Sequence, residues 1–213
     1  MIKINENKMK ESYNEKSPFW DKYLEYAWEL RSINNPIIDF MNNIISERMD
    51  GDKNYQLDLG TGMGVFSEDF PRHAQRRTYS DKYFNEKDRV VHRKPYIKLD
   101  FSDQDKVIET IQKEQSNVLT SFFALELYQS REQCAELYQR AFDETDVKCI
   151  VTSGIMPTYD RHRKVVEDNG VECYTSGYFV FPKNAQEYTL QSRAPSDLFG
   201  KNWMNCWRIL CKK

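Results

Sequence analysis

The stretch Tyr55-Gln56-Leu57-Asp58-Leu59-Gly60-Thr61-Gly62-Met63-Gly64 decides the fold of this chain. An apolar strand is predicted over residues 55–59, and it runs directly into a loop that contains three glycines. Glycine lets a backbone turn sharply and come close to a ligand. A short helix is expected to begin near Val65-Phe66, and the exposed N–H groups at its start favour an anionic or polar group. The stretch therefore predicts a strand, a ligand-binding loop and a helix.

The spacing of the glycines separates this loop from two common nucleotide-binding motifs. Gly60, Gly62 and Gly64 form a GxGxG pattern, whereas the dinucleotide fingerprint is GxGxxG. No GxxxxGKS/T loop occurs in the sequence, so a nucleoside-triphosphate site of that kind is not supported. The GxGxG loop, with Asp58 just before it, resembles the first motif of the class I S-adenosylmethionine-dependent methyltransferases. The ligand in that family carries a carboxylate and an amine but no pyrophosphate.

The resemblance implies an α/β fold of the Rossmann-like kind. The expected architecture is a mostly parallel, seven-stranded sheet with helices on both faces, an antiparallel C-terminal hairpin and an N-terminal helical cap. Apolar runs on the C-terminal side of the glycine loop predict the remaining strands, and the last two of these runs suit the antiparallel hairpin. These runs are 77–80, 96–99, 117–127, 149–154, 171–181 and 203–211.

Helix-start signals place the helices between these strands. Apolar residues at helical spacing predict helices from Ser102 to about Glu114, after the capping-box pair Ser130 and Gln133, and over 161–169. Ser17-Pro18 and Asn35-Pro36 begin two further helices that precede the first strand. Residues 1–52 are therefore expected to form an arm and helical cap, and 53–213 the Rossmann-like domain, as one globular unit.

The carboxyl ends of the strands should hold the cofactor, because ligands of open α/β sheets bind there. Asp81 ends the second strand, where a carboxylate can accept hydrogen bonds from both ribose hydroxyls. The resemblance implies that Asp100 meets the adenine amino group and that Phe101 lines the base, although Asp100 also suits a helix entry. Rings on the cap either stabilise the sulfonium by cation–π contact or simply pack the cap. The full predicted set is Asp58, Gly60, Thr61, Gly62, Gly64, Asp81, Asp100, Phe101, Phe123, Trp20 and Tyr23.

Glu126 and His162 are the candidate catalytic residues. Glu126 lies at the carboxyl end of the fourth strand, where it would act as a general base, orient a substrate amine or cap the next helix. His162 lies nearest to a predicted strand end among the three histidines. Tyr159 and Asp160 are further candidates. A base helps where the nucleophile is a phenol or a protonated amine, whereas a carboxylate nucleophile needs none.

Composition narrows the class of partner. The 213 residues carry a net charge of -2, so a nucleic-acid partner is not expected, because such binders usually show a basic excess. The five cysteines form no CxxC pair, which favours a reduced, cytoplasmic protein. No signal peptide, membrane-spanning run or metal site is indicated.

The sequence thus predicts methyl transfer from S-adenosylmethionine to an oxygen or nitrogen of a small molecule by in-line displacement, leaving S-adenosylhomocysteine. The segment after the fourth strand lacks the Asn/Asp-Pro-Pro-aromatic pattern and the Pro-Cys pair of base-modifying enzymes. The acceptor is expected between the N-terminal cap and residues 178–203. Two alternatives stay open: a methyltransferase acting on protein or RNA, and a non-catalytic cofactor-binding partner domain. A nicotinamide enzyme is disfavoured by the glycine spacing.

Overall fold

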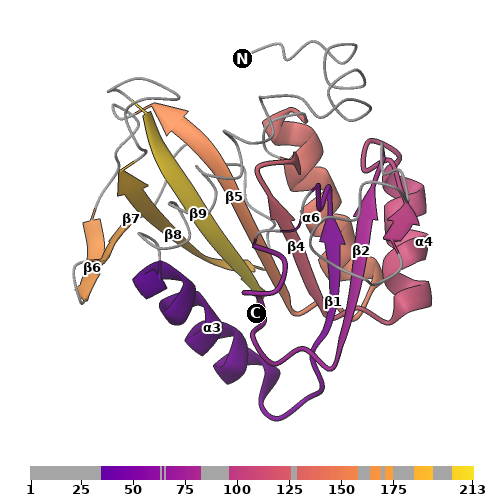
Figure 1. The fold of residues 1–213 in the computed structure, drawn as a ribbon, viewed down its shortest axis with the longest axis horizontal. Helices are drawn as coiled ribbons and strands as arrows, with labels where there is room; N and C mark the ends of the chain where they lie inside the picture. The colour runs from indigo at the N-terminus through magenta and orange to yellow at the C-terminus, as the bar shows by residue number, and fades with distance from the viewer. Residues whose placement is uncertain are drawn as a thin grey trace.

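The computed structural model contains one nine-stranded sheet with helices packed on both of its faces (Figure 1). It describes residues 35–62, 64, 66–82, 96–125, 129–157, 164–168, 171–174, 185–193 and 203–213. The helices are α3 (Asn35–Met49), α4 (Gln104–Glu114) and α6 (Arg131–Glu144). The strands are β1 (Tyr55–Leu59), β2 (Arg76–Asp81), β3 (Tyr96–Lys98), β4 (Val118–Phe122), β5 (Cys149–Pro157), β6 (Lys164–Asp168), β7 (Val171–Tyr174), β8 (Ala185–Arg193) and β9 (Trp203–Lys212).

The first five strands are parallel and create the place where a ligand is expected. Their order in the sheet is β3-β2-β1-β4-β5, so the chain moves outward from β1 to β3 and then returns to the other side of β1. This reversal makes a switch point between β1 and β4, where connections leave in opposite directions. The carboxyl ends of all five strands meet at one edge of the sheet.

The other four strands are antiparallel, and they extend the sheet beyond the predicted seven strands. β9 pairs with β5 and with β8, and the hairpin of β6 and β7 adds to β8. The Rossmann-like class and the predicted strand at 203–211 are confirmed. The strand predicted at 171–181 is present as β7 over Val171–Tyr174, but the partner of β9 is β8, and β7 pairs with the other side of β8. β8 has the polar sequence AQEYTLQSR and so carries no apolar signal.

The helix predicted over 161–169 is also wrong. Lys164–Asp168 is strand β6, and Asp168 is paired with Val171 of β7. The intervening dipeptide Asn169-Gly170 is a strong hairpin signal, although a glycine in that place also suits the end of a helix. The adjacent valines Val165 and Val166 are β-branched, which further favours a strand.

Successive turns replace the short helix expected after the glycine loop. Residues 66–73 are turns, with Ser67 N donating to Gly64 O at 3.2 Å and Asp69 N to Phe66 O at 3.0 Å. Pro71 lacks the N–H that a continuing helix needs. The Asn42 amide of α3 donates to Asp69 O at 2.7 Å and accepts from Arg72 N at 2.9 Å, so α3 satisfies backbone groups that a helix would satisfy itself.

Two apolar cores lie on opposite faces of the sheet. The first packs α3 against Trp207 and Ile209 of β9 and the turn residues Phe66 and Phe70. The second packs α4 and α6 against Leu57, Leu119, Ile150 and Leu210, among other residues. Side chains alternate between faces along a strand, so neighbouring residues of β4, β5 and β9 serve different cores.

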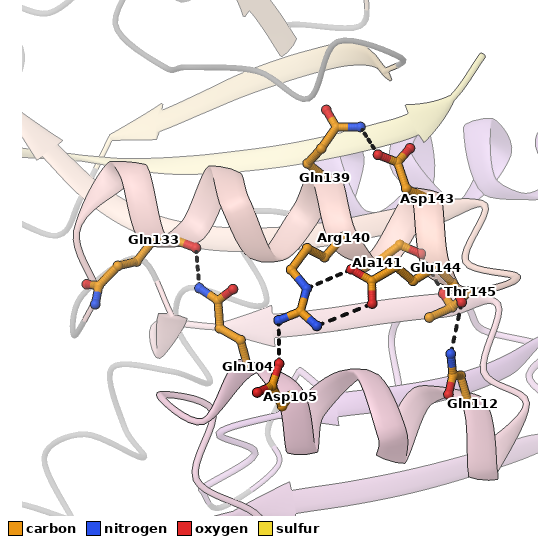
Figure 2. Close-up of polar contacts among 10 residues, drawn as sticks. All are labelled: Gln104, Asp105, Gln112, Gln133, Gln139, Arg140, Ala141, Asp143, Glu144 and Thr145. Atoms are coloured by element: carbon orange, nitrogen blue, oxygen red, sulfur yellow. Dashed lines mark hydrogen bonds and ion pairs between the residues drawn. The ribbon is translucent and has the colours of Figure 1, made fainter.

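Helices α4 and α6 begin with side-chain caps and are joined by polar contacts. The predicted capping box is present, since Ser130 accepts from Gln133 N and Gln133 accepts from Ser130 N. Helix α4 begins two residues later than predicted, with Asp103 as its N-cap. Figure 2 shows Arg140 of α6 reaching both Glu144 and Asp105, with the Arg140 Nη1 to Asp105 Oδ1 distance at 2.8 Å.

Candidate functional site

The glycine loop lies at the switch point and has no room for side chains at its first position. Gly60, Gly62 and Gly64 have φ values of +68°, +52° and +73°, a region that residues with a Cβ rarely adopt. A Cβ on Gly60 would lie 2.5 Å from Ala124 Cβ and 3.1 Å from Phe101 Cε1. The loop therefore packs directly on the segments that follow β3 and β4, and both segments belong to the same site.

Hydrogen bonds fix the loop to the end of β2. Thr61 N donates to Ser80 O at 2.9 Å, and Ser80 N donates to Thr61 Oγ1 at 3.2 Å. Gly62 N donates to Asp81 Oδ2 at 3.0 Å, and the hydroxyl of Tyr96 donates to Gly62 O at 3.3 Å. The structure thus brings the predicted ribose acid Asp81 against the predicted glycine loop.

Asp58 lies beneath the loop within a buried polar network. It has no exposed surface; Thr120 Oγ1 donates to its Oδ1 at 2.6 Å, and the Ser67 hydroxyl donates to Oδ2. Gln56 Nε2 continues the network by donating to Thr120 Oγ1 at 2.9 Å and to Ser67 O at 2.8 Å. Burial raises the pKa of Asp58 to about 6, although the hydroxyl hydrogen bonds act against the rise. This placement favours a positioning role for Asp58.

Asp100 follows β3 and has the opposite electrostatic environment. Lys82 Nζ lies 2.8 Å from Asp100 Oδ2, while Ser102 donates to Oδ1 from its backbone N at 3.0 Å and from its hydroxyl at 2.6 Å. Partial burial raises the pKa of Asp100, but these hydrogen bonds and the Lys82 charge outweigh it and hold the pKa below its usual value. Asp100 is therefore a fixed carboxylate that also shapes the entry to α4.

Phe123 leaves β4 in a strained conformation. Its φ is +53°, which is rare for a bulky residue and is a feature that clusters at functional sites. Its N donates to Ser153 O of β5 at 3.0 Å. Its ring centroid lies 5.9 Å from that of Phe66 and 6.1 Å from that of Trp207. Trp207 is not among the predicted site residues, since an aromatic residue within a predicted strand gives no signal that it lies beside this edge.

Comparison with known proteins identifies the fold. No family model and no curated protein matches the sequence. Magnesium protoporphyrin IX methyltransferase from Synechocystis PCC 6803, solved with bound S-adenosylhomocysteine, matches with a TM-score of 0.52 at 11% identity, over 97% of this chain and 99% of that one. The putative S-adenosylmethionine-dependent methyltransferase from Listeria monocytogenes matches with a TM-score of 0.48 at 14% identity, over 76% and 92%. The chain has the class I methyltransferase fold. The resemblance inferred from the glycine loop is therefore confirmed for the fold.

In this class I methyltransferase fold, most of the predicted cofactor residues gather at the carboxyl edge of the parallel strands. The loop residues Gly60, Thr61, Gly62 and Gly64 follow β1, and the other described members of the set lie within or just after β1, β2, β3 and β4. The four remaining predicted site residues lie outside the described residues, as do Tyr159 and Asp160; these four are Trp20, Tyr23, Glu126 and His162. Among the residues that the structure does describe, no group of three or more His, Cys, Asp or Glu side chains could hold a metal ion.

Proposed function

We propose that this chain is an S-adenosylmethionine-dependent methyltransferase that transfers a methyl group to a small-molecule acceptor. One observation carries the proposal: the GxGxG loop is tied to Asp81 by the 3.0 Å hydrogen bond from Gly62 N, at the switch point of the sheet. A glycine-rich loop beside a carboxylate suits a ligand that combines a ribose with an amino acid. The S-adenosylhomocysteine bound to the Synechocystis methyltransferase supports the same cofactor class.

The residues present fit this cofactor. Gly60 packs so closely on Ala124 and Phe101 that a Cβ does not fit, which holds the loop against the segments after β3 and β4. Asp81 would accept hydrogen bonds from the ribose, while Asp100 and Phe101 would hold the adenine end. Phe123 would border the site from β4, and the cap residues Trp20 and Tyr23 are proposed to cover it. When bound, the sulfonium supplies an electrophilic methyl group, and the chain's part is to align the acceptor with it and exclude water.

The acceptor side of the proposal rests on charge and on the absence of base-modifying motifs. A net charge of -2 gives no general attraction for nucleic acid. Glu126 or His162 would take the proton from a phenol or ammonium nucleophile, while a carboxylate acceptor would use neither. Residues 1–52 would close over the acceptor as a cap on the 53–213 domain.

We propose the cytoplasm as the compartment. No helix in the described ranges is long and apolar enough to cross a membrane.

Calorimetric titration with S-adenosylhomocysteine tests the cofactor. One-to-one binding by the wild-type chain is expected, and Asp81→Asn should weaken it by roughly 10- to 100-fold, the equivalent of a charge-assisted hydrogen bond. Asp143→Asn is the matched control, because Asp143 is an exposed acid on α6 that contacts Gln139. Absence of binding to the folded wild-type chain, or tighter binding of a nicotinamide dinucleotide, would refute the cofactor assignment.

A methyl-uptake screen tests the acceptor. The chain, with labelled S-adenosylmethionine, is offered separate fractions of metabolites, proteins and RNA. Label entering a metabolite supports the proposal, whereas label found only in protein or RNA overturns the small-molecule assignment. Cofactor binding with no transfer to any fraction would instead favour a non-catalytic partner domain.

A further inference from the structure

Cys149 and Cys211 face each other across the antiparallel strands β5 and β9. The neighbouring residues Lys148 and Lys212 are joined by a hydrogen bond from Lys212 N to Lys148 O at 2.9 Å. Paired positions alternate between hydrogen-bonded and non-hydrogen-bonded in an antiparallel ladder, so the cysteines occupy a non-hydrogen-bonded position. Their Cα atoms are then about 4.5 Å apart, within the range that a disulfide spans.

The two thiols already lie in contact. Their Sγ atoms are 3.8 Å apart, and neither residue has exposed surface. Closing this gap to the roughly 2.0 Å of a sulfur–sulfur bond needs side-chain adjustment only, because the backbone spacing is suitable. The Cys134 thiol, by contrast, lies against Leu125 O at 3.6 Å in the core on the other face of the sheet.

We propose that Cys149 and Cys211 form a redox modification site, in which a peroxide converts the two thiols to a cross-strand disulfide. The thiolate of one cysteine attacks a peroxide oxygen, which breaks the O–O bond and yields a sulfenic acid and hydroxide. The second cysteine then attacks the sulfenic sulfur, which forms the S–S bond and releases the sulfenic oxygen. With hydrogen peroxide, the two sulfurs lose two electrons and two protons, and the peroxide becomes two molecules of water.

The geometry suits either cysteine for the attack on the peroxide, because the two thiols face each other and are equally buried. Either thiol can donate the hydrogen bond that joins the two sulfur atoms. Burial acts to raise the pKa of either thiol, and the nearby Arg48 guanidinium acts to lower it. The thiolate is the reactive form of cysteine, so the cysteine that loses its proton attacks the peroxide and the other resolves the sulfenic acid.

The position of the pair determines what oxidation does to the molecule. Cys149 begins β5, whereas Ser153, which contacts Phe123, lies at the middle of that strand. A cross-link at this end holds β9 on the parallel half of the sheet without entering the proposed cofactor site. The two cysteines are 62 positions apart in the chain, so the disulfide closes a long loop and restricts the unfolded state.

The test uses the whole chain treated with hydrogen peroxide. Remaining thiols are alkylated in denaturant, and peptides are mapped by mass spectrometry without reduction. We expect one linked peptide pair that contains Cys149 and Cys211, alkylation of the other three cysteines, and reversal by dithiothreitol. The midpoint of thermal unfolding should rise on the order of 10 °C on oxidation.

Variants separate this pair from other sulfur chemistry. Cys211→Ala and Cys149→Ala should lose both the linked peptide and the thermal shift, whereas the control Cys134→Ala should keep both. If the alanine variants do not fold, the wild-type peptide map decides alone. Recovery of Cys149 and Cys211 on separate, unlinked peptides after the peroxide treatment, whether alkylated or over-oxidised, would overturn the proposal.

Discussion

Replacing Asp58 with Asn should remove a pH dependence from the stability of the protein. Burial raises the pKa of Asp58 from 3.8 to about 6. The folded state therefore keeps the proton to a higher pH than the unfolded state does. The contribution of Asp58 to stability is fully present below about pH 4 and is lost as the pH rises through about 6. The difference corresponds to about 3 kcal/mol at neutral pH, because one pKa unit is worth about 1.4 kcal/mol.

The amide that Asp58→Asn introduces has almost the same shape as the carboxyl group and does not ionise in this range. Its carbonyl oxygen can accept from Thr120, and its NH₂ group can donate to a rotated Ser67 hydroxyl, so the network is expected to persist. The free energy of unfolding of the wild type minus that of the variant should fall by up to about 3 kcal/mol between pH 4 and pH 7. Urea unfolding followed by tryptophan fluorescence at half-unit pH steps measures this difference.

Ser67→Ala should change the pH dependence of stability in the opposite direction, by raising the pKa of Asp58. The Ser67 hydroxyl donates to the Asp58 carboxylate and lowers its pKa, so its removal should raise the pKa of Asp58 further. The loss of stability with rising pH should then be larger and extend to higher pH than in the wild type. An identical pH slope in the wild type and in Asp58→Asn would refute the argument, because the slope would then come from other groups.

Three further changes test the loop, the strand end and a helix cap. Gly60→Ala should weaken S-adenosylhomocysteine binding at least roughly tenfold and destabilise the fold, since the added Cβ would meet Ala124. Gly51→Ala is the control, because Gly51 has φ +83° but open space around it. This control should cost only about 1–2 kcal/mol of backbone strain and leave binding unchanged. Lys82→Met should lower the affinity for S-adenosylhomocysteine by no more than about fivefold, because the ion pair of Lys82 with Asp100 is partly exposed. The loss of affinity should be smaller in high salt. Equal affinities of the wild type and the variant at low salt would contradict a role for Lys82. Ser130→Ala should lower the free energy of unfolding by about 1 kcal/mol in urea titrations through loss of the α6 cap, and an unchanged midpoint would show that the cap contributes nothing.

Local signals in the sequence are sufficient to predict the parallel half of the sheet. The glycine spacing after Leu57-Asp58-Leu59 predicts β1, its loop and the fold family, and an acid at the end of β2 predicts the neighbour of that loop. The Ser130–Gln133 capping box predicts the start of α6. Each of these depends on residues within one turn or one strand, where sequence spacing translates directly into geometry.

The antiparallel half depends on pairing between distant residues, and local patterns predict it less well. β8 buries Leu190 and Thr189 against β9, yet its sequence is mostly polar and carries no run of apolar residues. The sequence of β6 also suits a helix that Gly170 would end, and only its pairing with β7 decides between the two. The contact of Trp207 with Phe123 likewise arises from the order β4-β5-β9, which no local pattern specifies.

The three acids on or just after β1, β2 and β3 show why residue type alone does not define a role. Asp58 is buried under hydroxyl donors, and burial raises its pKa to about 6. Asp81 is held by a loop N–H, so its position reports the conformation of the glycine loop. Asp100 is paired with Lys82 and stays ionised. A fall in cofactor affinity as the pH drops through about 6 would therefore point to Asp58 rather than to Asp100, since the pKa of Asp100 is held below its usual value.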